Sequence, residues 1–420
     1  MNEASSPEEL VELVELCRAG KLFDVQKWVA QGKSVTPAGP AKGKGATRNP
    51  LRIAMEKGFH SMVQVLLEAG APWRAGNYKA LDDAVEMRRP DLATLLIQHG
   101  AQVADISMAY VLEMWHPEMV ELFLANGASL VRGNPVACAL IYKMRPALGL
   151  LKRFADDPAV MKQGAAALRY HAGEGNTKWV SLLLWAGADP WARGPYRLEQ
   201  LDEEDCDDGE ADDEEGLSAF EWAAFRGKID VLGQRGMLKA MAANPSSAAK
   251  LIADACHASD CTVLSWLLKR GYRADALADR GSDAINSLLG SMSWEYPVVS
   301  SPTWLSSPSA GGLDSSHARE RMKMLHMLVA HGAQWLPVDK NTIGHARRNL
   351  LKMAPKYLLE FAWLMRRYRA ARRADVEELM RTPSVARLLG PDRGKLNQIV
   401  AGIPDAPSAG VGLETGKSSS

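Results

Sequence analysis

A short phrase, an apolar run that ends in glycine, recurs along this chain and limits how the chain can fold. It reads MVQVLLEAGAPW from Met62, LATLLIQHGAQV from Leu92 and MVELFLANGASL from Met119, with later copies from Trp179 and Met324. The glycines that end these runs are Gly70, Gly100, Gly127, Gly187, Gly271 and Gly332. Most of the intervals between them are close to one or two periods of about 30 residues, which is typical of a repeat protein.

Each repeat predicts two short helices. In NPLRIAMEKG, apolar residues predict a first helix that ends at Gly58, and FHSMVQVLLEAG predicts a second helix. The apolar stripe of that second helix is Met62, Val63, Leu66 and Leu67. Gly70 follows the stripe, where a helix commonly ends in the left-handed conformation that glycine adopts without a Cβ clash. Because two short helices cannot bury their apolar faces alone, we expect neighbouring pairs to stack.

The two halves of the pattern are clearest in GLSAFEWAAFRGKIDVL from Gly216 and WVSLLLWAGADP from Trp179. These segments resemble the ankyrin repeat, whose form is roughly G-x-T-P-L-H-x-A-A-x-x-G-H-x-x-V-V-x-L-L-L-x-x-G-A. The matching residues of the first half are Gly216, Ser218, Phe220, Ala223, Ala224, Gly227 and Val231. In the second half, Ala188 and Asp189 follow the glycine of the repeat.

The resemblance implies an all-α fold, a helical-repeat solenoid of ankyrin-like helix pairs, with about nine or ten repeats over residues 8–365. The T-P-L-H turn of the family is not intact, and its nearest copies are NPLR at Asn49 and NPVA at Asn134. The first repeat intervals, between Gly70, Gly100 and Gly127, are shorter than the family's period of about 33 residues. They leave less room for the β-hairpin finger between helix pairs, so we expect short or irregular fingers.

Insertions interrupt the predicted array at 33–48, 191–215 and 291–318, where Gly, Pro, Ser or acidic residues replace the repeat. Residues 366–400 predict two or three helices, which we interpret as a helical C-terminal cap, because a terminal repeat needs an outer face compatible with solvent. Residues 401–420 contain few apolar side chains and predict a disordered tail.

Charge and cysteine content narrow the class of protein. Lys+Arg and Asp+Glu both number 50, so the net charge is zero, whereas a protein that coats DNA or an anionic membrane is more often basic. The five cysteines are scattered, which favours a reducing compartment. The beginning of the chain, MNEASSPEELVELVELC, lacks the basic and apolar regions of a signal peptide, and no apolar run approaches the length of a membrane span. We expect a cytoplasmic protein without membrane contact.

Motifs for catalysis or metal binding fail on spacing. In GVGLETGKSSS, Val411 stands where a phosphate-binding loop needs glycine. The acidic segment fits a calcium loop poorly, because Cys206 would take an oxygen-ligand position. Cys256 and Cys261 lack the second ligand pair of a zinc site, and Cys256 falls on an apolar helix position. The sequence therefore predicts no cofactor, no metal and no enzymatic activity.

Aromatic residues next to the repeat glycines are the first candidates for partner binding. Trp73, Trp191 and Trp335 lie three or four residues after a repeat glycine, and Tyr78 and Tyr196 follow the first two. In an ankyrin-like stack this position begins the finger, at the edge of the concave binding surface, and interface hot spots favour Trp and Tyr. The alternative is that each indole packs at the base of its own finger.

An acidic segment is the second candidate. The stretch DEEDCDDGEADDEE, from Asp202 to Glu215, is acidic at every position except Cys206, Gly209 and Ala211. It predicts an extended, solvated insertion that either docks a basic partner or has no partner. The residues expected to bind are Asp202, Glu203, Glu204, Asp207 and Asp208.

The stretch RRYRAARR supplies a basic candidate. Its arginines, interleaved with Tyr368, are typical of contacts with nucleic acid or phosphate, or of the solvated face of a capping helix. They are Arg366, Arg367, Arg369, Arg372 and Arg373.

These features favour a non-enzymatic interaction protein. Proteins that resemble ankyrin arrays generally bind a partner protein along the concave face, so an adaptor, an inhibitor or an effector is expected. The alternative function is contact with nucleic acid or phosphate through the basic run, or an enzymatic activity hidden in the weakly repetitive parts.

Overall fold

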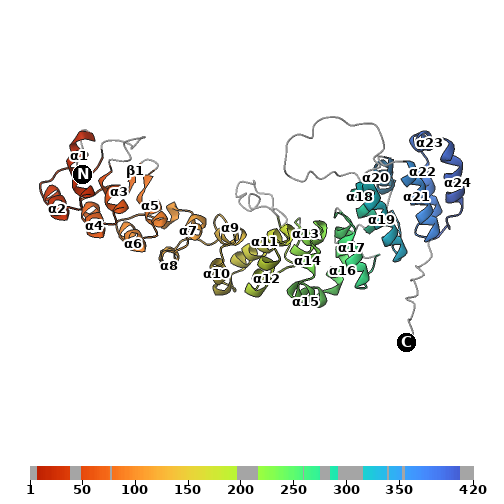
Figure 1. The fold of residues 1–420 in the computed structure, drawn as a ribbon, viewed down its shortest axis with the longest axis horizontal. Helices are drawn as coiled ribbons and strands as arrows, with labels where there is room; N and C mark the ends of the chain where they lie inside the picture. Colours follow the sequence, from red (N-terminus) through yellow and green to blue (C-terminus); the bar gives the residue numbers. More distant parts are fainter. Residues whose placement is uncertain are drawn as a thin grey trace. The chain divides into compact units, whose positions relative to one another are not determined.

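The structure, a computed structural model, describes residues 7–37, 49–75, 78–195, 216–258, 260–274, 284–291, 316–337, 340–351 and 355–406. Helices dominate the described residues (Figure 1), which confirms the expected all-α class. The chain divides into two compact units: an N-terminal unit up to Gly164 and a C-terminal unit from Ala165 onward, with the division inside α11 (Pro158–Glu174). No helix among the described residues is long and apolar enough to cross a bilayer.

Helices of the N-terminal unit come in consecutive pairs. The elements are η1 (Pro7–Leu10), α1 (Val11–Arg18), α2 (Leu22–Ala30), α3 (Pro50–Glu56), α4 (His60–Glu68), α5 (Ala80–Glu86), α6 (Pro90–Gln98), η3 (Val103–Asp105), α7 (Met108–Met114), α8 (Pro117–Ala125), α9 (Pro135–Ile141) and α10 (Ala147–Arg153). The first helices, α1, α3, α5, α7 and α9, pack on one another in one row, and α2, α4, α6 and α8 pack in a second row (Figure 1).

The C-terminal unit repeats this pattern with more variation. Its elements are α12 (Thr177–Ala186), α13 (Ala219–Phe225), α14 (Ile229–Leu232), α15 (Arg235–Ala243), α16 (Pro245–Ala255), α17 (Thr262–Lys269), α18 (Ala284–Ser291), α19 (Ser316–Ala330), α20 (Lys340–Leu351), α21 (Pro355–Arg367), α22 (Arg373–Met380), α23 (Pro383–Leu389), η5 (Gly390–Asp392) and α24 (Arg393–Ala401). In one row α13, α16, α18, α20 and α22 pack in order, and α19, α21 and α24 pack in order in another.

The core of each helix pair comes from the predicted stripe. In α4 the buried side chains are Met62, Val63, Leu66 and Leu67, as the spacing predicted. Ser218 and Glu221 form a capping box at the beginning of α13. The predicted core position of Cys256 is confirmed, because its side chain is fully buried.

The repeat glycines hold the backbone conformation that the sequence predicted. Their φ angles are +86° at Gly70, +99° at Gly100, +83° at Gly127, +101° at Gly187, +84° at Gly271 and +91° at Gly332. Each lies in the left-handed region, where a side chain with a Cβ is strained. The glycine therefore ends each second helix and redirects the chain toward the next pair.

Buried polar side chains satisfy backbone groups of neighbouring helices. Gln163, with 2% of its surface exposed, accepts hydrogen bonds from Val136 N at 2.9 Å and Ala137 N at 3.2 Å, in the first turn of α9. Asn349 Nδ2 donates to Leu289 O at 2.8 Å. Helix ends leave such N–H and C=O groups without intrahelical partners, so these bonds fix the register between pairs.

Several predicted boundaries are wrong by a few residues. The insertion at 33–48 begins later, because Ser34 is buried and its carbonyl accepts from Trp28 Nε1 at 3.0 Å. The insertion at 291–318 ends earlier, since α19 begins at Ser316. The cap cannot begin at residue 366, which lies inside α21, and the tail cannot begin at residue 401, because Ile403 is fully buried. Residues 407–420 lie outside the described residues.

The first prediction concerns Gly100, which has no atom within 4 Å of the place that a Cβ would take. Only the positive φ then opposes a side chain, so Gly100→Val lowers the free energy of unfolding by about 1–2 kcal/mol. Urea unfolding followed by circular dichroism measures this. The matched control is Gly149→Ala at an equally open site inside α10, where alanine keeps or raises stability. Equal stability of Gly100→Val and the wild type would contradict the role of the left-handed turn.

Candidate interaction surface

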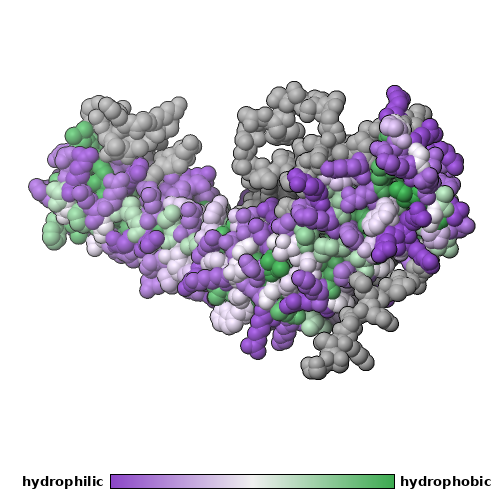
Figure 2. Space-filling model, turned by 45° about the vertical axis from the view of Figure 1, so that its right-hand side comes forward, coloured by the Kyte–Doolittle hydropathy of each residue, from purple (hydrophilic) through white to green (hydrophobic). Residues whose placement is uncertain are grey.

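Large apolar patches do not mark a site on the visible face of the molecule. Figure 2 shows hydrophobic residues there as small, separate patches among hydrophilic ones. Scattered apolar side chains are normal on a protein surface and need no partner. The candidate surfaces considered for partner binding are defined by charge and by single aromatic side chains.

Two predicted contact residues lie at a short β-hairpin. The strands β1 (Arg74–Ala75) and β2 (Tyr78–Lys79) are antiparallel, with Ala75 opposite Tyr78. Trp73 precedes β1, is half-buried, and accepts a hydrogen bond from Ala80 N at 2.8 Å through its carbonyl. The side chain of Tyr78 lies outside the described residues. A short finger was expected between helix pairs, and this hairpin stands at that place.

Charged side chains link the hairpin to η3, before the following helix pair. Arg74 Nη1 donates to both carboxylate oxygens of Asp105 at 3.2 and 3.3 Å, and Lys79 Nζ donates to the carbonyl of Asp105. Asp105 closes η3, which comes before α7. The hairpin is thus held against the next helix pair by polar contacts.

Trp191 packs against its own unit more closely than an open contact residue would. Its ring lies 4.1 Å from the ring of Phe220, centroid to centroid, and Nε1 donates to Ala240 O at 3.4 Å. Arg193 forms an ion pair with Glu221. Residues 191–195 therefore belong to the packed fold and not to the insertion placed at 191–215. Tyr196 and the acidic residues Asp202, Glu203, Glu204, Asp207 and Asp208 lie outside the described residues.

The contact role predicted for Trp335 is wrong. The side chain is fully buried, with 0% of its surface exposed. Its Nε1 donates to Asn286 Oδ1 at 3.1 Å, its ring packs edge-on against Phe361 at 5.4 Å, and its backbone N donates to Ala370 O at 2.6 Å. Trp335 is a core residue that joins segments far apart in the sequence.

Trp335→Ala is expected to lower the free energy of unfolding by about 3–5 kcal/mol, because it removes a large buried side chain and leaves Asn286 without its indole donor. Trp363→Ala is the matched control on α21, since 46% of Trp363 is exposed. Urea unfolding compares the two. A similar, small loss for both variants would contradict the core assignment.

A column of glutamates follows the first helices of the N-terminal unit. Glu56 and Glu86 are the last residues of α3 and α5, Glu113 is next to last in α7, and all three are exposed. Their spacing along the chain is identical to that of the first three repeat glycines. Sequence reasoning missed this column because it followed apolar residues, although aligning the repeats on their glycines exposes it.

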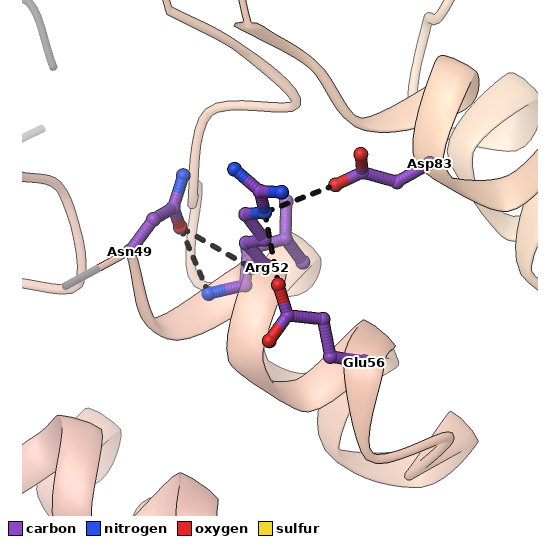
Figure 3. A network of polar contacts seen from close by, with 5 residues as sticks. Asn49, Arg52, Glu56 and Asp83 are labelled. Carbon is purple, nitrogen blue, oxygen red and sulfur yellow. Dashed lines mark hydrogen bonds and ion pairs between the residues drawn. The ribbon is translucent and has the colours of Figure 1, made fainter. Parts of the chain in front are cut away.

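A polar network engages Glu56, the first glutamate of this column (Figure 3). Arg52 Nε lies 3.0 Å from Glu56 Oε1 in the same helix and 3.6 Å from Asp83 Oδ2 in α5. Asn49 caps α3, because its Oδ1 accepts from Leu51 N at 3.0 Å and Arg52 N at 3.4 Å. The network fixes the direction of Arg52, so that it bridges two successive first helices.

Tyr110 lies within the field of these carboxylates. Burial raises its pKa, and the charges of Glu86, Asp82 and Glu113 raise it further. Burial also raises the pKa of Asp82; nearby Lys79 lowers it and Asp105 raises it. We call Glu56, Asp82, Glu86, Tyr110 and Glu113 the acidic first-helix face. Its potential favours a positively charged ligand.

Glu86→Gln is expected to lower the pKa of Tyr110 toward its ordinary value of 10, because Glu86 is the carboxylate whose charge raises this pKa most. NMR of the tyrosine ring carbons against pH measures this, with Tyr110→Phe to assign the signal. Glu68→Gln, on α4, removes a charge from the second helix of a pair and serves as control. An unchanged Tyr110 pKa in Glu86→Gln would contradict this electrostatic assignment.

The basic run divides into two parts. Arg372 Nε donates to Asp375 Oδ2 at 2.6 Å, and Arg373 Nε donates to Ile403 O at 2.8 Å, so both are held by the fold. Arg366 and Arg367 end α21, and Arg369 follows with a φ of +52°. Within the described residues, the side chains of these first three arginines form no hydrogen bond or ion pair, and all three are exposed.

The described residues hold no group of three His, Cys, Asp or Glu side chains placed to share a metal ion. An open groove of about 840 Å³ lies between α6 and α8, lined by charged residues that include Arg89, Asp91, Glu118 and Glu121.

No family model matches the sequence, and no curated protein matches it.

Proposed function

We propose that this chain is a non-enzymatic protein-binding module, built as a divergent solenoid of ankyrin-like helix pairs with short fingers and a helical cap at α22–α24. The support comes from the two rows of packed helices in each unit, from the left-handed repeat glycines and from the hairpin at β1–β2. The capping box of Ser218 and Glu221 lies in the segment GLSAFEWAAFRGKIDVL, which resembles the first half of an ankyrin repeat.

The acidic first-helix face is the observation that carries this proposal. Three exposed glutamates stand at equivalent places in consecutive repeats, close to the C-terminal ends of their helices. Glu56 is paired with Arg52 in its own helix, but Glu86 and Glu113 oppose the helix macrodipole at a cost of about 0.3–1 kcal/mol each, so helix stability does not account for these two. An exposed column of like charge is suited to a partner of opposite charge.

The partner of this face is a positively charged segment of another protein, which this chain binds as an adaptor, an inhibitor or an effector. The resemblance to ankyrin arrays implies binding along fingers and first helices, which in this chain are the hairpin and the acidic first-helix face. Trp73 and Tyr78 stay proposed contact residues, as do Tyr196 and the acidic residues from Asp202 to Asp208, whereas Trp191 packs against Phe220 and is no longer proposed.

The test compares two double variants with the same change in net charge. Affinity purification with the wild-type chain identifies the partner, and interferometry then measures its binding at two salt concentrations. Glu86→Gln with Glu113→Gln weakens binding roughly 3- to 10-fold, mostly through a slower association rate, and reduces the salt dependence.

Glu68→Gln with Glu118→Gln, on the second helices α4 and α8, is the matched control and leaves binding unchanged. Equal effects of the two double variants would show that the first-helix face is not the binding surface. Partner binding that is insensitive to both pairs would do the same.

A further inference from the structure

The helices α19 and α21, with the turn up to Arg369, concentrate positive charge in a chain whose net charge is zero. These two segments contain two carboxylates, Glu320, which pairs with Lys323, and Glu360. Against them stand seven cationic side chains: Arg319, Arg321, Lys323, Lys356, Arg366, Arg367 and Arg369. All are exposed except Arg321, which is buried and donates to the carbonyls of Cys256 and His257.

The cations of the two helices belong to one surface. α19 packs on α21, and His326 Nε2 of α19 lies 2.7 Å from Tyr368 Oη in the turn after α21. On α19, Arg319 and Lys323 are exposed with His326 at positions i, i+4 and i+7, which places them along one side of the helix. The His326–Tyr368 contact thus joins the cationic side of α19 to the arginines that follow α21.

The arginines at the end of α21 are available to a ligand. Arg367 and Arg369 have no hydrogen-bonded or acidic partner within the described residues, whereas Asp375 engages Arg372 and the carbonyl of Ile403 engages Arg373. Arginine presents its donors in a planar fork that matches a phosphate group. We call Arg319, Trp363, Arg367 and Arg369 the basic edge.

An exposed indole distinguishes the basic edge from a general anion-binding surface. Trp363 is 46% exposed and lies one helical turn before Arg367, so that both side chains project from the same face of α21. Aromatic side chains beside a cationic track are the usual means of binding single strands, because bases stack on the ring while phosphates meet the cations. An acidic peptide offers no base for Trp363.

We propose that the basic edge binds single-stranded nucleic acid, with phosphates contacting Arg367, Arg369 and Arg319, and a base stacked on Trp363. This is independent of the protein-binding role of the acidic first-helix face, which belongs to the N-terminal unit. Neutral overall charge argued against nucleic acid in the sequence, but counterion release depends on the local cations that meet phosphates.

The experiment measures fluorescence anisotropy of a fluorescein-labelled oligodeoxythymidylate of about 20 nucleotides, a length that exceeds the site sizes of known single-strand modules. It is titrated with the full chain at several salt concentrations. Arg367→Ala with Arg369→Gly reduces the slope of log K against log salt by about 1.4, since each phosphate contact on a single strand contributes about 0.7. Trp363→Ala weakens binding roughly 5- to 100-fold and leaves this slope unchanged.

Matched controls change the same residue types elsewhere. Arg132→Ala with Arg145→Ala removes two arginines of the N-terminal unit, and Trp185→Ala removes an indole that is 63% exposed on α12. Both controls keep the wild-type affinity and slope. Circular dichroism verifies the fold of every variant, and glycine at position 369 also removes the strain of its left-handed backbone.

Three results overturn the proposal. One is the absence of oligonucleotide binding at about 50 mM salt, where phosphate contacts are strongest. Another is an equal loss of affinity in the control variants. The third is displacement of the oligonucleotide by polyglutamate at equal charge together with no effect of Trp363→Ala, which assigns the basic edge to an acidic protein instead.

Discussion

The fold depends on the burial that short helices obtain from one another. Many of the first helices are as short as α3 and α5, and isolated helices below about 12–15 residues are marginal in water. Their apolar stripes are covered by the partner helix and by the next pair in the same row. The left-handed glycine after most second helices helps this packing to repeat, because it ends the helix at a fixed point and turns the chain. Polar side chains such as Gln163 then satisfy the helix ends that the short turns leave open.

Sequence reasoning succeeded where the signal is local and repeated. The stripe of α4 and the conformation of Gly70 both follow from spacing within one repeat. It failed where segments distant in the sequence determine whether a side chain is buried. Trp335 stands at the same distance after its glycine as Trp73, yet Asn286 and Phe361, which bury it, lie in other helices. The end of the fold was misplaced for the same reason. Residues 401–406 contain glycine and proline, which are typical of turns, but Ile403 is buried and Arg373 donates to its carbonyl.

The candidate surfaces show a second limit of prediction from sequence, which is that charges far apart in the chain gather in space. The acidic segment attracted attention because its charges are consecutive, although the described carboxylates that gather are spread over three successive first helices. A charge on a helix matters through its neighbours in space, and Glu86 and Glu113 act together on Tyr110 only because α5 packs on α7. The basic run was visible in the sequence, but its division was not. Packing neutralises Arg372 and Arg373 and leaves Arg367 and Arg369 available.

The backbone of Arg369 is left-handed, a conformation that is strained for a residue with a side chain. Non-glycine residues with positive φ are uncommon, and a left-handed conformation costs roughly 1–2 kcal/mol for a residue with a Cβ. Arg369 has a φ of +52° after α21, in the place where second helices such as α4 and α6 are followed by glycine. Its exposed side chain forms no hydrogen bond or ion pair within the described part of the chain, so no polar contact there offsets that cost. Arg88 and Lys143 are also left-handed two residues after a helix end, so this conformation at a cationic residue is not unique to Arg369. What places Arg369 in the proposed basic edge is its exposed side chain beside Arg367.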